Sequence, residues 1–378
     1  MKEYRLSELL KIRNGRDYKH LSKGPYPVYG SGGLMLYVDN YLYDKPSILL
    51  PRKGSLSNIQ YADTPFWTVD TLYYSEVDET KADAFYLFYY LKLLDLSKLD
   101  SGTGVPSMTF DSYYNIRVSL PDLHEQKRIS RLLKTLDEGI KTKQEINDYL
   151  AAMARQLYDY WFVQFDFPNE NGKPYKSSGG EMVWDDRLKR SIPSHWDGQS
   201  LLDVLDLFDS KRVPLSSIQR ASMKGPYPYY GATGIMDYIN DYIFDGEFIL
   251  LAEDGSTSAP DGSPIVQYIW GKNWVNNHAH IILPKDRKRI HFCFLQLKSI
   301  PAKMMETGSI QKKISQENLL KQLVVVPDKD TVSLFESIMT PLWEKKMNTT
   351  EQIIELTRQR DDLLPLLMNG QVNCQATK

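Results

Sequence analysis

The stretch "GPYPVYGSGG" occupies residues 24–33, and "GPYPYYGATG" occupies residues 225–234. The two stretches are identical at seven of their ten positions and lie 201 residues apart. Self-similarity at a fixed offset indicates that a structural unit occurs more than once in a chain. The extent of this repeat therefore decides the architecture that we expect.

The repeat continues well past these ten positions. At the same offset, "SILLPRKGS" (47–55) aligns with "FILLAEDGS" (248–256). The second copy then carries a longer loop, "APDGSP" (259–264), after which Trp67 aligns with Trp274. Roughly 120 residues thus occur twice, each time followed by a segment of about 40 residues. A chain of 378 residues also exceeds the size of one ordinary hydrophobic core.

Each copy contains patterns typical of both strands and helices. The runs "SILLP" and "FILLA" are short, apolar and bounded by Gly or Pro, as buried strands are. The runs "AFYLFYYLKLL" (84–94) and "HFCFLQLKSI" (291–300) predict one helix per copy. We therefore expect an α+β protein with two similar globular α/β modules.

The segments that follow the two copies have a different pattern. Residues 123–164 contain no Pro and one Gly, and their apolar residues recur at spacings of four and three, as in a coiled-coil seam. Residues 331–369 carry a similar stripe, in which Pro341 predicts a kink or a new helix start. The predicted seam consists of Ile129, Leu133, Leu136, Ile140, Leu150 and Leu157 in the first segment, and Leu334, Ile338, Ile353, Leu356 and Leu363 in the second.

A long helix with one narrow apolar stripe needs a partner along that stripe. We expect the two helices to pair antiparallel; the alternative is that each folds back as a hairpin on its own module. The predicted organisation is a first module (1–121), a first helix (122–166), a linker rich in Gly, Ser and Pro (167–199), a second module (200–327), a second helix (328–370) and a tail (371–378).

The composition indicates a soluble protein of near-zero charge. The most apolar stretch (84–94) is interrupted by Lys92 and is too short to cross a bilayer. Cys293 and Cys374 are too few for a disulfide framework or a zinc site, so we expect a cytoplasmic protein. A formal net charge of −2 excludes phosphate binding over the whole surface. If the chain binds nucleic acid, its basic residues gather on one face or a partner supplies more.

Motifs for catalysis are absent from the sequence. It has no phosphate-binding loop of the G-x-x-x-x-G-K-[ST] type, and residues 30–33 do not match the dinucleotide fingerprint. Pro327-Asp328 and Glu344–Lys346 spell a nuclease pattern, but they fall on the predicted helix. His278 and His280 alternate as strand ligands would, yet no third ligand lies at metal spacing, so a structural or surface role is favoured. These features favour a binding protein over an enzyme.

Several phrases resemble the specificity subunits of type I restriction-modification systems. They are Pro-Tyr-x-x-Tyr-Gly at 25–30 and 226–231, Gly-Thr-Gly-x-Pro-x-x-Thr at 102–109 and Leu-Pro-x-x-x-Glu-Gln-Lys-Arg-Ile at 120–129, with "YDYWFVQFDFP" (158–168) and "IPSHW" (192–196). Their order makes the resemblance specific and extends it over essentially the whole chain. The second copy departs from the pattern, because it lacks the Glu-Gln pair of residues 125–126.

This resemblance implies two target recognition domains, each reading one half of a bipartite site in double-stranded DNA. It implies that the helices are spacers that dock modification subunits and relate the modules by a pseudo-two-fold axis. Adenine methylation with S-adenosylmethionine would belong to those subunits, and ATP-driven cleavage to a restriction/translocase subunit. The chain itself would bind no cofactor or metal and do no chemistry. A scaffold protein without a DNA role, or an enzyme with an unrecognised site, are the alternatives.

The candidate DNA-binding residues lie where the two copies differ. Arg52-Lys53 align with Glu253-Asp254, which is a charge inversion within a matched frame. We expect this loop to face DNA, with surface drift as the alternative. The candidates are Arg52, Lys53, Ser55 and Asn58 in the first copy, Ser256, Thr257, Asn276, Asn277 and His278 in the second, and Thr103, Ser107, Gln311, Lys312 and Lys313 beside the glycine turns as phosphate contacts.

The repeated phrase itself predicts a tight turn, because Gly and Pro dominate it. We expect Tyr26, Tyr29, Tyr227 and Tyr230 to pack this turn onto its module, and we favour that role over contact with DNA.

Overall fold

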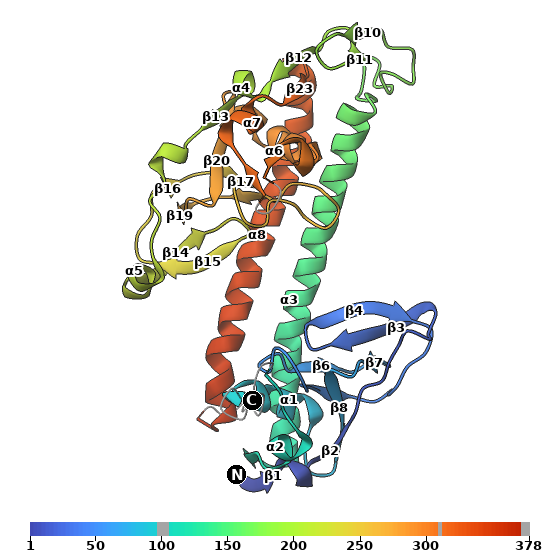
Figure 1. The fold of residues 1–378 in the computed structure, drawn as a ribbon, viewed down its shortest axis with the longest axis vertical. Coiled ribbons are helices and arrows are strands. Elements are labelled where there is room, and N and C mark those ends of the chain that lie inside the picture. The colour runs from blue at the N-terminus through green and yellow to red at the C-terminus, as the bar shows by residue number, and fades with distance from the viewer. Residues whose placement is uncertain (97–105, 309–311, 372–378) are drawn as a thin grey trace, which may run out of the picture. The chain divides into compact units, whose positions relative to one another are not determined.

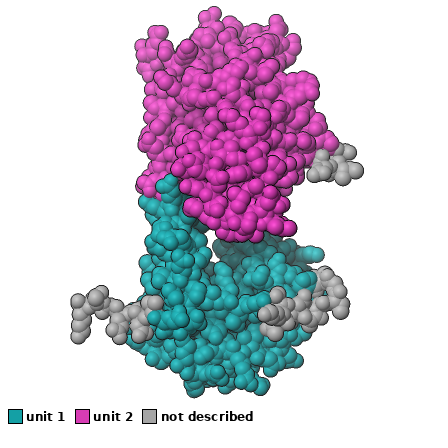
Figure 2. Space-filling model, turned by 90° about the vertical axis from the view of Figure 1, so that its left-hand side faces the viewer, with its two compact units in different colours: residues 1–145, 350–378 teal, residues 146–349 magenta. Residues whose placement is uncertain are grey.

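The structure is a computed structural model that describes residues 1–96, 106–308 and 312–371. The chain divides into two compact units, residues 1–145 with 350–378, and residues 146–349 (Figure 2). Both divisions fall inside long helices. Each unit therefore consists of one globular module and part of each helix.

The module of the first unit is built from small sheets and short helices (Figure 1). Its first strand pairs antiparallel with its last, so the module closes where the long helix begins. The strands of its main sheet, in spatial order, are β2 (Leu10–Arg13), β8 (Leu72–Val77), β5 (Ser47–Pro51) and β6 (Gln60–Ala62); a second sheet has β4 (Gly33–Val38), β3 (Lys23–Gly30) and β7 (Trp67–Thr68); β1 (Lys2–Arg5) pairs with β9 (Arg117–Leu120); and the helices are α1 (Ala84–Lys92) and α2 (Phe110–Tyr114).

The module of the second unit follows the same plan, as the repeat predicted. Its main sheet has the order β13 (Leu205–Leu207), β20 (Ala279–Pro284), β17 (Phe248–Ala252) and β18 (Val266–Ile269), and a second sheet has β15 (Ile235–Ile239), β14 (Lys224–Tyr230), β19 (Lys272–Val275) and β16 (Phe244–Asp245); β12 (Asp197–Ser200) pairs with β23 (Leu323–Val326), β21 (Glu306–Thr307) pairs with β22 (Lys313–Ile314), and the helices are α4 (Leu201–Val204), α5 (Ser217–Ser222), α6 (Ile290–Ser299) and α7 (Gln316–Leu320).

The predicted core elements are confirmed in both modules. All five residues of β5 are buried, and so are the last four residues of β17. Helices α1 and α6 lie at the predicted positions, and each buries most of its residues. These runs are mostly apolar because both faces of each element meet other parts of the module.

The repeated Gly-Pro-Tyr-Pro phrase forms a strand, which corrects the prediction of a turn. It is the first strand of a hairpin in each module, β3 with β4 and β14 with β15. A Cβ added to Gly24 would lie 2.3 Å from the Cα of Asp39, and one added to Gly225 would lie 2.3 Å from the Cα of Asn240. Glycine is thus required for the close approach of two backbones, not for a turn.

The two long helices are α3 (Leu123–Tyr158), which ends in a π-helical turn at Asp159–Val163, and α8 (Lys329–Met368). Each begins at an aspartate cap: Asp122 accepts a hydrogen bond from the Glu125 N–H, and Asp328 accepts one from the Thr331 N–H. Helix α8 continues through Pro341, so a new helix start at that residue was the wrong alternative.

Within each unit the helices run antiparallel and contact each other, as predicted (Figure 1). In the first unit, Lys143 of α3 donates a hydrogen bond to Gln352 of α8 at 2.5 Å. In the second unit, the Phe335 ring of α8 lies 5.6 Å from that of Trp161. The alternative in which each helix folds back on its own module is therefore not adopted.

The predicted seam is right for α3 and partly wrong for α8. Ile129, Leu133 and Ile140 are buried, whereas Leu334 and Ile338 are 47% and 38% exposed. The buried stripe at the start of α8 is shifted by one residue because this half of the helix also packs on the core of the second module. It consists of Val332, Phe335, Met339 and Trp343; the remaining predicted seam residues, Leu136, Leu150, Leu157, Ile353, Leu356 and Leu363, are half-buried.

The predicted linker (167–199) contains regular structure. Strands β10 (Met182–Asp185) and β11 (Arg190–Pro193) form a hairpin, and the Phe167 ring stacks on Trp196 with centroids 4.6 Å apart. This segment is therefore part of the second unit's core. Among the residues that the structure describes, no helix is both long and apolar enough to cross a membrane.

Candidate nucleic-acid interface

The same backbone frame holds the candidate DNA-binding loop in both modules. In the first, the Met108 N–H donates to the Arg52 carbonyl at 2.9 Å, and Lys53 forms an isolated β-bridge with Ser107. In the second, the Ile314 N–H donates to the Glu253 carbonyl at 2.8 Å, and Asp254 bridges Lys313. The aligned charge inversion therefore occurs at one structural position.

In the first module this loop presents cations. Lys53 and Ser55 are exposed, and the Arg52 guanidinium lies 6.0 Å from the Tyr73 ring and donates to the Asp70 carbonyl. The Tyr73 hydroxyl donates to the Met108 carbonyl at 3.3 Å, which ties the underlying sheet to the loop. Asn58 is half-buried and donates from Nδ2 to the Ser31 carbonyl at 2.7 Å, so it links this loop to the tip of the β3–β4 hairpin.

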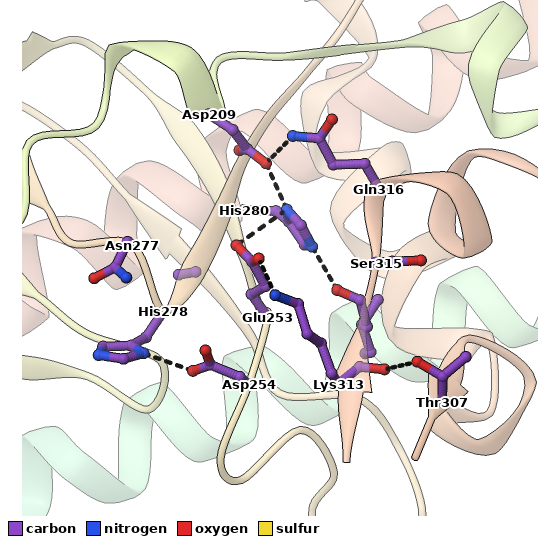
Figure 3. A network of polar contacts seen from close by, with 12 residues as sticks. Asp209, Glu253, Asp254, Asn277, His278, His280, Thr307, Lys313, Ser315 and Gln316 are labelled. Atoms are coloured by element: carbon purple, nitrogen blue, oxygen red, sulfur yellow. Dashed lines mark hydrogen bonds and ion pairs between the residues drawn. The ribbon is translucent and has the colours of Figure 1, made fainter. Parts of the chain in front are cut away.

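His280 of the second module (Figure 3) aligns with Tyr73 of the first at the offset of 207. It pairs with Leu251 on β17 as Tyr73 pairs with Leu50 on β5. Its Nε2 lies 2.8 Å from the Ile314 carbonyl, and its Nδ1 lies 2.6 Å from Asp209 Oδ2. Both ring nitrogens therefore face hydrogen-bond acceptors, and His280 connects β20 to β22 and to Asp209.

Two basic side chains, Arg212 and Lys313, complete this network. Arg212 Nη1 lies 2.6 Å from Glu253 Oε2, and Lys313 Nζ lies 3.0 Å from Glu253 Oε1. Arg212 also donates to the Asn277 and Ala279 carbonyls, at 3.3 and 2.8 Å. The loop that carries Asn277 is therefore held in place by an arginine whose own charge is neutralised.

The carboxylates of the network remain ionised although they are largely buried. Burial opposes the charge on Asp209, but the hydrogen bonds from His280, the Ile281 N–H and Gln316 outweigh it and lower the pKa of Asp209. Burial likewise opposes the charge on Glu253, and its hydrogen bonds with Arg212 and Lys313 lower the pKa of Glu253.

Asp209, Glu253 and His280 also have the composition of a metal site. One ligand atom from each lies within 4.8 Å of the others. Carboxylate and imidazole groups are common metal ligands. Here, however, Arg212 and Lys313 neutralise the acidic side chains, and both nitrogens of His280 are engaged in hydrogen bonds. This chemistry fits a network that supports the loops better than it fits a metal ion.

Two candidate residues of the second module face inward, which corrects the prediction. Thr257 is 1% exposed and donates from Oγ1 to Glu306 at 2.6 Å. Asn276 is 3% exposed, and its Oδ1 accepts a hydrogen bond from the His278 N–H. Both were placed on the surface because polar residues in loops usually are, yet here each satisfies a buried polar group.

The other candidates of the second module reach the surface. His278 is exposed, with its Nδ1 2.6 Å from Asp254 Oδ1, and Lys312 pairs with Glu306 at 2.8 Å. Asn277, Ser256 and Lys313 are exposed as well. In the first module Ser107 is half-buried. Thr103 and Gln311 lie outside the described residues.

Sequence reasoning missed the residues that support these loops. Asp209 and Arg212 are far from Glu253 in the sequence, whereas Gln316 follows Lys313 closely, and none of the three belongs to a recognisable motif. Gln60 and Gln267, in contrast, could have been found from the sequence, because the repeat aligns them at the offset of 207. Gln60 donates to the Gly30 carbonyl at 2.8 Å, and Gln267 donates to the Gly231 carbonyl at 2.9 Å.

The tyrosines of the repeated phrase pack within their own modules. The Tyr26 and Tyr41 rings are 5.1 Å apart, and the Tyr227 and Tyr242 rings are 5.2 Å apart, both edge to face. Tyr29 contacts the cluster around Phe66, and Tyr230 lies against the cluster around Leu250. These contacts agree with a structural role for all four.

The duplicated modules on paired helices, with like frames and unlike loops, define a protein of the DNA-specificity class. The family model described as the type I restriction modification DNA specificity domain matches residues 1–152 and 193–358. The chain belongs to this family, and is a DNA sequence-recognition subunit of a type I restriction-modification system.

Individual relatives agree with this assignment. The type I restriction enzyme MjaIX specificity subunit of Methanocaldococcus jannaschii is 24% identical over 357 residues, which cover 88% of this chain and 79% of that protein. The HindI specificity subunit of Haemophilus influenzae is 22% identical over 353 residues, covering 75% and 74%. The crystal structure of a type I S subunit from M. genitalium shares the fold, with a TM-score of 0.61 and 17% identity over 97% of this chain and 95% of that one.

Proposed function

We propose that each module reads one half of a bipartite site in double-stranded DNA with the loop that follows its central strand. The observation that carries this proposal is that Arg52 and Lys53 share a backbone frame with Glu253 and Asp254. Arginine and lysine suit guanine or phosphate, whereas the Asp254 carboxylate suits the amino group of cytosine. Glu253 supports the loop from below, since Arg212 and Lys313 engage its carboxylate. Two loops with the same backbone frame but opposite charges would thus select different bases in the two half-sites of the DNA.

Neighbouring loops of the second module would add to its reading surface. Asn277 and His278 are exposed beside Asp254, and an asparagine amide suits adenine. Lys312 is exposed, pairs with Glu306 and suits phosphate. Arg212 would act as a positioning residue, because it holds the loop through the carbonyls of Asn277 and Ala279.

The long helices would set the separation of the two half-sites. Helices α3 and α8 have 36 and 40 residues, and a helix rises about 1.5 Å per residue. Two paired rods of this length are stiff. We expect half-sites whose centres lie about 34–36 Å apart, one turn of the duplex.

The chemistry would belong to other subunits of the system. We infer that modification subunits methylate adenine with S-adenosylmethionine, that a restriction/translocase subunit uses ATP to translocate and cleave DNA, and that this chain binds neither cofactor and works in the cytoplasm. A net charge of −2 releases few counterions on DNA binding. Tight binding should therefore require the modification subunits.

The test is to exchange the charges of the first loop in the intact system. The variant Arg52→Glu/Lys53→Asp is expressed with its partner subunits, and methylated adenines are mapped over the genome. We expect the recognised sequence to change or relax in one half-site only. The control Lys92→Glu reverses an exposed charge of the same module on α1, away from the loop, and should leave both halves unchanged.

An unchanged recognition sequence in the double variant would contradict the proposed reading loop. Methylation that persists at the same sites after deletion of this chain would instead favour the scaffold alternative. Methyl transfer by the purified chain alone would show that it is an enzyme.

A further inference from the structure

A cavity of about 430 Å³ lies within the second unit, among α3, α6 and α8. Arg155 lines it from α3, Lys298 from α6 and Lys346 from α8. Asp261 and Ser263 line it from the loop at 259–264, which is longer than in the first copy. A concave site of this size can hold a small organic molecule.

The first unit has an ion pair at the corresponding position. There Arg360 pairs with Asp137, which also accepts a hydrogen bond from the Tyr89 hydroxyl. At the offset of 206, the residues aligned with Tyr89, Asp137 and Arg360 are Leu295, Trp343 and Ala154. Leu295 and Trp343 both line the cavity. None of the three aligned residues is charged, so the second unit lacks this ion pair, and the cavity lies at its position.

Basic side chains outnumber acidic ones in the lining of the cavity. The basic residues are Arg155, Lys298 and Lys346, and the acidic residue is Asp261. The Asp261 carboxylate accepts hydrogen bonds from the Ser263 N–H at 3.0 Å and from the Ser263 hydroxyl at 2.7 Å. Much of its hydrogen-bonding capacity is therefore used within its own loop.

Carboxylates around the cavity do not balance its two lysines. Asp159 pairs with Arg155 at 2.8 Å, and Asp148 favours the charge on Lys346. Even so, the pKa of Lys298 and the pKa of Lys346 are both lowered. Burial is the main cause, and each lysine is also close to another cation, Arg155 for Lys298 and Lys298 for Lys346. An anion bound between the two ammonium groups would offset this cost.

The surroundings of the two lysines indicate the class of anion. Lys298 Nζ lies 5.7 Å from the Phe294 ring, and Lys346 Nζ lies 5.6 Å from the Trp343 ring. Lysine binds phosphate as a point charge. The apolar side chains beside the lysines, among them Leu295, suit the carbon-rich part of a ligand. A phosphate joined to an organic group therefore fits the cavity better than a bare phosphate ion.

We propose that this cavity binds a small organic phosphate, whose phosphate group contacts Lys298 and Lys346. The inference goes beyond the proposed function and does not depend on it. The backbone of DNA carries the same phosphate chemistry. A free molecule fits better, because both lysines are half-buried in a concave wall, whereas a duplex presents its phosphates on a convex surface.

The experiment titrates the purified full chain by isothermal titration calorimetry. The probes are adenosine monophosphate and glycerol phosphate, with inorganic phosphate, adenosine and a short DNA duplex as comparisons. Lys298→Met and Lys346→Met each remove one charge and keep the length of the side chain, whereas Lys298→Arg keeps the charge. The matched control is Lys92→Met, because Lys92 aligns with Lys298 at the offset of 206 and lies 5.5 Å from the ring of the aligned Phe88. Thermal melting of each variant checks that it is folded.

We expect both organic phosphates to bind the parent more tightly than inorganic phosphate or adenosine does. Lys298→Met and Lys346→Met should each weaken this binding at least about tenfold, as the loss of a charge-assisted hydrogen bond does. Lys298→Arg and Lys92→Met should bind the organic phosphates like the parent.

Absence of binding by both organic phosphates would overturn the inference, and so would unchanged binding in the folded variants Lys298→Met and Lys346→Met. Equal affinity for inorganic phosphate would also overturn it, because the organic group would then contribute nothing. Loss of duplex binding in the same two variants, with no binding of the organic phosphates, would assign the lysines to the DNA backbone instead.

Discussion

Arg360 Nη1 lies 3.0 Å from Asp137 Oδ1, although 223 positions separate the two residues. The side chains are 20% and 30% exposed, and Asp137 also accepts a hydrogen bond from the Tyr89 hydroxyl at 2.5 Å. Burial opposes the charge on Arg360, but the hydrogen bonds with Asp137 and Asp361 outweigh it and raise the pKa of Arg360. One ion pair thus joins the end of α8, the beginning of α3 and the first module.

The substitution Asp137→Asn should test this pair. It leaves a partly buried guanidinium without its carboxylate, and we expect the free energy of unfolding to fall by about 1–3 kcal/mol in denaturant titrations. The control Glu355→Gln removes an exposed partner of Arg358 on the same helix and should lower the stability less than Asp137→Asn does. Equal losses of stability in the two variants would show that the Arg360–Asp137 pair does not hold α8 against α3.

The corrected stripe of α8 predicts unequal effects at neighbouring positions. Phe335→Ala removes a fully buried ring that contacts Phe162 and Trp161, and it should lower the free energy of unfolding by about 3–5 kcal/mol. Leu334→Ala changes a side chain that is 47% exposed and should cost less than about 1 kcal/mol. A larger loss of unfolding free energy for Leu334→Ala than for Phe335→Ala would instead support the seam that the spacing predicted.

The repeated hairpin predicts a glycine requirement at one position and not at another. The Cβ in Gly24→Ala would meet the backbone of Asp39 at 2.3 Å, so the strands must separate and the melting temperature should fall by several degrees. Gly32→Ala lies in the same hairpin with nothing within 4 Å of its added Cβ, and should melt like the parent. Thermal unfolding followed by circular dichroism distinguishes the two; a stable Gly24→Ala protein would contradict the close approach.

The Glu253 network predicts a dependence of stability on pH. Because the pKa of Glu253 is lowered in the folded state, its ion pairs stabilise fully above about 4.3, the ordinary glutamate value, and are lost as the pH falls through the lowered folded value. Glu253→Gln should therefore be less stable than the parent at pH 7, and the difference should shrink as the pH falls toward 3. Melting temperatures across this range test it, and a constant difference would show that the ion pairs contribute nothing.

Sequence patterns predicted the structure best where they consist of apolar runs or of apolar residues at a regular spacing. The strands at 47–51 and 248–252, the helices at 84–92 and 290–299 and the antiparallel long helices follow from apolar runs and spacing. The tight-turn prediction at Gly24 was wrong because Gly and Pro favour turns, and only the neighbouring strand shows that this glycine admits another backbone.

The candidate site depended more on tertiary contacts. The aligned pair Arg52 and Glu253 was visible in the sequence, but the burial of Thr257 and Asn276 was not. Nor was the support of Glu253 by Arg212, which is 41 residues away. The sequence does not predict which polar groups form hydrogen bonds or ion pairs, because the fold brings together the partners from distant positions in the chain.

By itself, the sequence determined that two like modules and two long helices make up this protein, because duplication and periodicity are properties of the chain alone. The tertiary structure decided which face of α8 is buried, which loop residues reach the surface and how the charges of the second module are balanced. The physical reason is that burial and ion pairing depend on distances between residues far apart in the chain, and these distances exist only once the modules have folded.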